Sequence, residues 1–149
     1  MDKVRFVSEP VEMEYTRSPG KILGHFFARM RDEGTLMAIR CSNCSQVFLP
    51  PQQFCPECTH KMTNFVEVPS EGRIASFTVM RKDSPFCELT APYSYVAVQF
   101  EGVDSLFWHF CKDTEDLRAG DRVRAVFKSM DDREGSLLDL LYFERVRES

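Results

Sequence analysis

The spacing of the hydrophobic residues changes once along this chain, near residue 65. Before that point, one group of large apolar side chains recurs at intervals of three and four residues, the spacing that places them on one side of a helix. These are Ile22, Leu23, Phe26, Phe27 and Met30. Ser18 and Pro19 are residues that begin helices, and Gly34 is one that ends them. The pattern therefore predicts a helix of about four turns between residues 18 and 34.

The segments on either side of this helix are less regular. Residues 1–17 are mixed in character and contain Pro10, so we expect an extended arm there. After Gly34, the stretch "TLMAIR" at residues 35–40 fits either a second short helix or a strand, and its pattern does not choose between them.

After Phe65 the apolar residues alternate with polar ones, which is the spacing of strands with one buried face. Five such runs follow, separated by turn-forming segments, and they occupy residues 72–82, 93–100, 105–111, 121–128 and 137–146. Five short strands predict a small closed or partly open barrel, for which the OB-fold is the five-stranded candidate. We therefore expect a mainly β protein, with a brief helical turn within residues 113–121 and with Trp108 packed in the core.

Composition and charge narrow the class of protein. The chain has 149 residues, of which 43% are hydrophobic, and a formal net charge of -4. Basic and acidic residues are equal in number up to Pro69, so the acidic excess falls in the barrel segment. Proteins that bind a phosphate backbone usually present a basic face instead. The sequence shows no apolar run of signal-peptide or membrane-spanning length, so we expect a cytoplasmic protein without a membrane partner.

Four of the six cysteines form two closely spaced pairs in "RCSNCSQVFLPPQQFCPECTH", residues 40–60. Cys41, Cys44, Cys55 and Cys58 give C-x2-C, ten residues, and C-x2-C, the spacing of a tetrahedral four-thiolate site. Reduced thiols are expected without a secretion signal. We therefore predict one structural zinc ion in a rubredoxin-like ribbon, with iron in the same cage as the main rival. His60 is expected beside the site and not among its ligands.

The remaining cysteines, Cys87 and Cys111, are the candidates for a catalytic thiol. Cys111 lies two residues after His109 on a predicted strand, so both side chains point to the same face. A cysteine in an aromatic strand is more often a core residue than a nucleophile. We expect no independent catalysis by this chain, although the pattern alone leaves its enzyme status uncertain.

Several motifs resemble those of a known family. The helix rich in Phe, the ribbon with its "FLPP" insert at residues 48–51, "PYSYVAVQF" at 92–100 and "DLRAGDRV" at 116–123 occur in the family's order. They resemble the small rubredoxin-like zinc-ribbon plus OB-fold proteins that accompany acyl-CoA thiolases. The resemblance implies an N-terminal arm and helix at residues 1–37, a zinc ribbon at 38–65 and an OB-fold at 66–149.

The resemblance also implies a function. Family members look like noncatalytic partners of a thiolase-fold catalytic subunit, needed for assembly and for shaping a β-oxoacyl-CoA site, with the coenzyme A thioester bound mainly by the partner. Thiolases are commonly dimeric, which suggests a heterotetramer. An aromatic substrate such as 2-benzoylsuccinyl-CoA fits the Phe-rich chain, as do acetoacetyl-CoA and steroid side chains.

Two surfaces are candidates for contact with such a partner. The loop from Arg81 to Pro92 joins the first two barrel strands, where OB-folds often meet ligands, and we expect Arg81 or Lys82 to face CoA phosphates and Phe86 to add apolar contact. The alternative is an ordinary solvated loop.

The helix stripe, above all Phe26, Phe27 and Met30, is the second candidate, and packing on the chain's own core is the alternative for it.

A different function class stays open. Zinc ribbons and OB-folds both occur in proteins that bind single-stranded nucleic acid, and aromatic residues such as Phe77, Tyr95, Phe107 and Trp108 are able to stack on bases. The acidic barrel segment disfavours this alternative.

Overall fold

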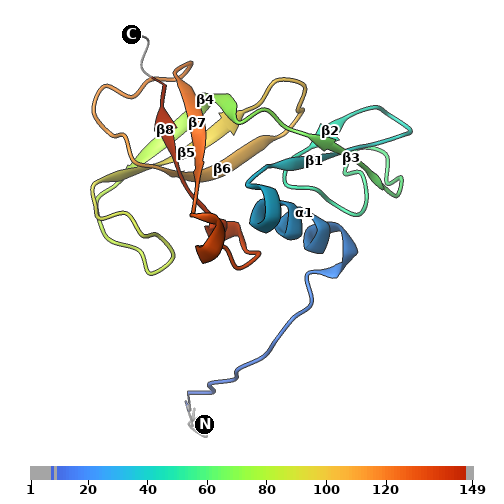
Figure 1. The fold of residues 1–149 in the computed structure, drawn as a ribbon, viewed down its shortest axis with the longest axis horizontal. Coiled ribbons are helices and arrows are strands. Elements are labelled where there is room, and N and C mark those ends of the chain that lie inside the picture. Colours follow the sequence, from blue (N-terminus) through green and yellow to red (C-terminus); the bar gives the residue numbers. More distant parts are fainter. Residues whose placement is uncertain (1–7, 9, 147–149) are drawn as a thin grey trace, which may run out of the picture.

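The computed structural model describes residues 8 and 10–146 (Figure 1). Residues 10–19 form neither helix nor strand and run away from the body of the molecule. In this segment Val11, Met13 and Tyr15 are exposed. This part of the predicted arm is therefore extended, as expected. No helix among the described residues has the length and hydrophobicity needed to cross a membrane.

The predicted helix is present as α1, Gly20–Glu33. Gly34 ends it in the left-handed conformation, with φ of 63°, and its N–H donates to the carbonyl oxygen of Met30. Only glycine adopts this conformation without steric cost, which is why the helix stops here. Ser18 does not cap the first turn from the N-cap position, which Pro19 occupies.

A three-stranded antiparallel sheet follows the helix, in the order β2-β1-β3. Its strands are β1 Met37–Arg40, β2 Val47–Phe48 and β3 Asn64–Glu67. The stretch after Gly34 is thus a strand. Met37, Ala38 and Ile39 are buried in succession and pair with β3, and Ile39 also pairs with β2.

The five predicted strands close into a barrel in the order β4-β5-β6-β8-β7. They are β4 Glu71–Met80, β5 Tyr93–Gln99, β6 Leu106–Cys111, β7 Arg122–Phe127 and β8 Leu140–Arg145. Pairing of β4 with β7 closes the ring, and β6 meets β8 in parallel at one pair, Cys111 with Phe143. The mainly β prediction and the five-stranded barrel are confirmed.

Two connections differ from expectation. Residues 113–121 form turns and not a helical turn, with Asp116 at a positive φ of 56°. The connection between β7 and β8 instead contains two short 3-10 helices, η1 Met130–Asp132 and η2 Leu137–Asp139. The buried carboxylate of Asp139 holds the second one, as it accepts from the N–H groups of Glu134, Gly135 and Ser136 at 2.7–3.2 Å.

One hydrophobic core runs through helix, small sheet and barrel. Phe26 and Met30 from α1, Val47 from β2, and Val96 and Phe143 from the barrel belong to the same buried cluster. A smaller cluster surrounds the paired cysteines and includes Ile39 and Met62. The three sequence segments therefore share their main core.

Hydrogen bonds join the small sheet to the barrel at the loop between β5 and β6. The N–H of Val47 donates to the Asp104 carboxylate at 2.7 Å, and the Asp104 N–H donates to the Val47 carbonyl at 2.8 Å. Leu49 is bonded twice to the Ser105 hydroxyl, through its N–H at 2.8 Å and its carbonyl at 3.0 Å. The edge of β2 is thus completed by the barrel.

Candidate metal centre and neighbouring surfaces

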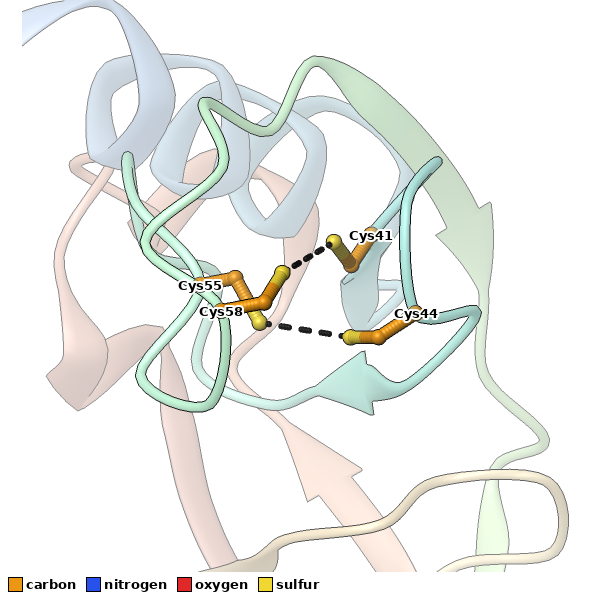
Figure 2. A group of neighbouring side chains, drawn as sticks. All are labelled: Cys41, Cys44, Cys55 and Cys58. Carbon is orange, nitrogen blue, oxygen red and sulfur yellow. Dashed lines mark hydrogen bonds between the residues drawn. The ribbon is translucent and has the colours of Figure 1, made fainter.

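The four paired cysteines converge on one point between two loops (Figure 2). Their sulfur atoms all lie within 4.8 Å of one another, and the Sγ–Sγ distances are 3.5 Å for Cys41–Cys58 and for Cys44–Cys55. A tetrahedral zinc with bonds of about 2.3 Å to sulfur needs Sγ–Sγ distances of about 3.8 Å. The arrangement fits a four-thiolate ion with no open coordination position.

The two cysteine loops repeat the same backbone hydrogen bonds. In the first, the Cys41 N–H donates to the Gln46 carbonyl at 2.8 Å, and in the second, the Cys55 N–H donates to the His60 carbonyl at 2.9 Å. The residue after each second cysteine, Ser45 or Thr59, is left-handed, with φ of 66° and 59°. The two loops therefore present their sulfur pairs by the same turn.

Hydrogen-bond donors in the two cysteine loops affect the pKa values of two thiols of the site, Cys58 and Cys44. The Asn43 side chain, and then the backbone N–H of His60, lower the pKa of Cys58 to about 6. At Cys44 the backbone N–H of Gln46 favours the thiolate, but burial and the neighbouring sulfurs outweigh it and raise the pKa to about 12. A metal ion that binds here displaces the remaining protons, so metal binding releases protons and weakens in acid. His60 contributes through its backbone, in keeping with its predicted place beside the site.

The loop between β4 and β5 is exposed and tied down at two points. The Asp83 carboxylate accepts from the Ala91 N–H at 2.8 Å, and Glu88 pairs with Lys128 at 3.0 Å. Phe86 is 70% exposed. Arg81 and Lys82 are exposed too, and among the described residues neither forms an ion pair.

The helix stripe lies mostly inside the molecule. Phe26 is 1% exposed and Met30 is fully buried, both in the chain's own core. The prediction that these two side chains contact a partner is therefore wrong, because they do not lie on the surface. Phe27 is half-buried and packs against the same core.

The two unpaired cysteines are poorly placed to be nucleophiles. Cys111 is fully buried, and burial raises its pKa to about 11. Burial also raises the pKa of Cys87. His109 lies on the same inner face as Cys111, as predicted, and burial lowers its pKa to about 4. Its Nδ1 atom is buried without a hydrogen-bond partner among the described residues.

Trp108 is not a core residue, contrary to expectation, but is 44% exposed and stacks on Tyr95 with ring centroids 5.6 Å apart. Its neighbours Phe107 and His109 point inward, so the alternation along β6 turns Trp108 outward. That alternation was the signal in the sequence that could have identified this surface.

Two family models match the chain in succession. Residues 29–62 match the rubredoxin-like zinc ribbon domain of ChsH2, and residues 65–128 match the C-terminal OB-fold domain of ChsH2. Together the two matches cover more than half of the chain.

Two curated archaeal relatives are similar in sequence, and both are DUF35 domain-containing scaffold proteins. The one from Methanocaldococcus jannaschii is 28% identical over 112 residues, which are 72% of this chain and 78% of that protein. The one from Methanothermobacter thermautotrophicus is 29% identical over 97 residues, 64% of this chain and 73% of that protein.

Two solved structures share the fold at 18% sequence identity. A DUF35 family protein of unknown function from Sulfolobus solfataricus has a TM-score of 0.63, with 85% of this chain and 87% of that chain covered. A chain of the Ltp2–ChsH2(DUF35) aldolase has a TM-score of 0.60, with 87% of this chain and 97% of that chain covered. At this identity the likeness supports the fold alone.

Proposed function

We propose that this chain, which belongs to the ChsH2 family, is a noncatalytic accessory subunit of a thiolase-type acyl-CoA enzyme. In that family a rubredoxin-like zinc ribbon precedes an OB-fold domain. A thiolase-fold subunit supplies the nucleophile and binds most of the coenzyme A thioester. This chain binds one structural zinc ion, joins the catalytic subunit in a heterotetramer, and helps to shape the β-oxoacyl-CoA site.

The observation that carries this proposal is the combination of a closed four-cysteine site with the absence of an activated thiol elsewhere in the described residues. Four clustered sulfurs saturate a zinc ion, so the metal is structural. A catalytic thiol needs a lowered pKa or an adjacent base, whereas burial raises the pKa of both remaining cysteines. The scaffold proteins and the Ltp2–ChsH2(DUF35) aldolase that this chain resembles support a role within an assembly.

The loop between β4 and β5 is the element that we place at the acyl-CoA site. Arg81 and Lys82 lie at its start, and neither forms an ion pair within the part of the chain that the structure describes. Cations bind phosphate oxygens through strong, charge-assisted hydrogen bonds. Phe86 adds an apolar side chain at 70% exposure. Since the loop base is closed by Asp83, these groups project from a defined position.

Kinetics of the complex test this role. The tagged chain is purified with the thiolase-fold subunit that accompanies it, and the acyl-CoA thiolysis rate is measured with acetoacetyl-CoA and 2-benzoylsuccinyl-CoA. Replacing both Arg81 and Phe86 with alanine should raise the KM for acyl-CoA about tenfold, which corresponds to about 1.4 kcal/mol of lost binding, and leave zinc content unchanged. Arg118→Ala, at an exposed residue of another loop, is the control.

An unchanged KM in the double variant would remove the loop from the acyl-CoA site. Purification of the chain without any thiolase-fold subunit would instead remove the accessory role itself.

Single-stranded nucleic-acid binding is the second candidate, and the outward stacking of Trp108 on Tyr95 favours it. Proteins of this type combine aromatic platforms with a basic groove. The charges of the barrel segment make this candidate weaker, since acidic residues outnumber basic ones there.

A further inference from the structure

On the outer face of β4, β5 and β6, two neighbouring rows of residues carry no charged side chain. Directly paired residues share a face of a sheet, and the pairs align two rows here. The rows are Thr78, Tyr95 and Phe110, and Ser76, Ala97 and Trp108. A third row, Arg73, Gln99 and Leu106, lies beside them and carries one cation at its β4 end. In a chain with 28% charged residues, two adjacent outward-facing rows without a charge are unusual.

Tyr95, Leu106, Trp108 and Phe110 form what we call the aromatic face. Leu106 is 39% exposed, and Tyr95 and Phe110 are half-buried. Tyr95 contacts both aromatic neighbours, with ring centroids 5.6 Å from those of Trp108 and Phe110. The rings support one another, so docking would cost little ordering of these side chains.

This chain's own core does not cover the aromatic face. The opposite side of the same strands supplies the buried cluster, through residues such as Val96, Val98 and Phe107. Trp108 points away from that cluster. Exposed aromatic patches of this kind are enriched at protein interfaces.

The aromatic face continues into the loop between β4 and β5. Phe110 lines a hollow of about 150 Å³ together with Phe86 from that loop and Leu138 from η2. The face and the proposed acyl-CoA loop are therefore parts of one surface, and a partner that reaches Phe86 lies next to Phe110.

Charge selects the kind of partner. The two rows that contain Trp108 and Phe110 lack basic residues, and Arg73 is the one cation at the aligned positions, whereas binding a phosphate backbone takes several cations. At the hollow, Glu88 is paired with Lys128 at 3.0 Å. An aromatic surface of this kind fits an apolar protein surface, because contact at Tyr95, Trp108 and Phe110 requires no charge to be desolvated.

We infer that the aromatic face, with Trp108 near its centre, is the surface on which the thiolase-fold catalytic subunit docks through an uncharged apolar surface of its own. The inference rests on the proposed accessory function and assigns its interface to the barrel strands, not to the helix stripe.

The single tryptophan allows a direct test on the intact chain. Trp108 is the only Trp, so incorporation of 5-fluorotryptophan gives one fluorine NMR signal from the aromatic face. Addition of the purified, unlabelled thiolase-fold subunit should shift or broaden that signal. No substitution is needed, so folding of a variant does not limit this measurement.

Matched variants measure the affinity. Leu106→Glu places a charge on the aromatic face at a partly exposed position, and it should raise the Kd for the catalytic subunit at least about tenfold. Phe54→Glu changes an apolar residue of the ribbon that is 54% exposed, and it should change the Kd less than about threefold. Zinc content and thermal unfolding verify that both variants are folded.

The possible outcomes distinguish an error in the proposed interface from an error in the proposed accessory function. If the wild-type chain binds the catalytic subunit while the fluorine signal is unchanged and Leu106→Glu binds equally well, the interface lies elsewhere and the accessory role stands. If the signal responds to single-stranded DNA, or to the concentration of the chain itself, the face binds nucleic acid or a second copy, and the inference is wrong. If the wild-type chain binds no thiolase-fold subunit, both proposals are wrong.

Discussion

At the scale of single residues, His109 is the clearest case of a side chain whose chemistry is set by its surroundings. It is 2% exposed and lies among the rings of Phe107, Phe110 and Phe143. An imidazolium ion in such an apolar site would lose its hydration, so the neutral form is favoured and the pKa falls to about 4.

This burial predicts a loss of stability in mild acid. Between pH 6.5 and 4, His109 is protonated in the unfolded chain but neutral in the folded one. Because the unfolded state binds more protons, the free energy of unfolding decreases as the pH falls through this range. The contribution is about 2 kcal/mol between pH 7 and pH 5. Urea unfolding at the two pH values, followed by Trp108 fluorescence, measures it.

His109→Leu should reduce this pH dependence by that amount, and His25→Gln, which removes an exposed histidine, should retain it. Thiol protonation at the metal site also contributes in acid, but equally in all three proteins. Equal pH dependence in His109→Leu and the wild type would contradict the assignment.

At the scale of elements, the connection between β7 and β8 shows how one side chain organises a loop. The Asp139 carboxylate accepts three backbone N–H groups, and the Ser136 side chain in turn accepts from the Leu138 N–H. The bonds to Asp139 give partners to three partly buried backbone donors. The segment that packs against α1 and helps to line the hollow beside the aromatic face is thereby fixed.

Asp139→Ala should lower the free energy of unfolding by about 3 kcal/mol, because it removes three charge-assisted bonds and leaves partly buried donors without those partners. Asp131→Ala, an exposed residue of the neighbouring η1, should change it by less than about 0.5 kcal/mol. Chemical denaturation measures both. Similar values for the two variants would show that the carboxylate does not hold the loop.

At the scale of the whole molecule, sequence patterns predicted the secondary-structure elements and the metal site better than the contacts between elements. The periods of the apolar residues identified α1 and five barrel strands, and the spacing of four cysteines identified the site that Figure 2 shows. Spacing is a local property, so it could not tell whether Phe26 and Met30 face a partner or the core. The role of Asp139 also depends on a loop conformation that no local pattern specifies.

The division into ribbon and barrel is likewise less sharp in space than along the chain. The predicted boundary near residue 65 separates two sequence patterns, but the main core contains residues from both sides of it. Helix, ribbon and barrel are therefore expected to unfold together and not as separate units.

The bonds between β2 and the loop after β5 connect the metal site to backbone amides far from it in sequence. The Asp104 N–H donates to the Val47 carbonyl, which lies in the strand between the two cysteine pairs. Protection of this amide from hydrogen exchange depends on β2 staying in place. Chelation of zinc should therefore accelerate deuterium uptake at Asp104 at least about tenfold, whereas the Lys128 amide, bonded to Asp139 in the connection between β7 and β8, should respond less. A barrel amide would then serve as a reporter of metal occupancy in the ribbon.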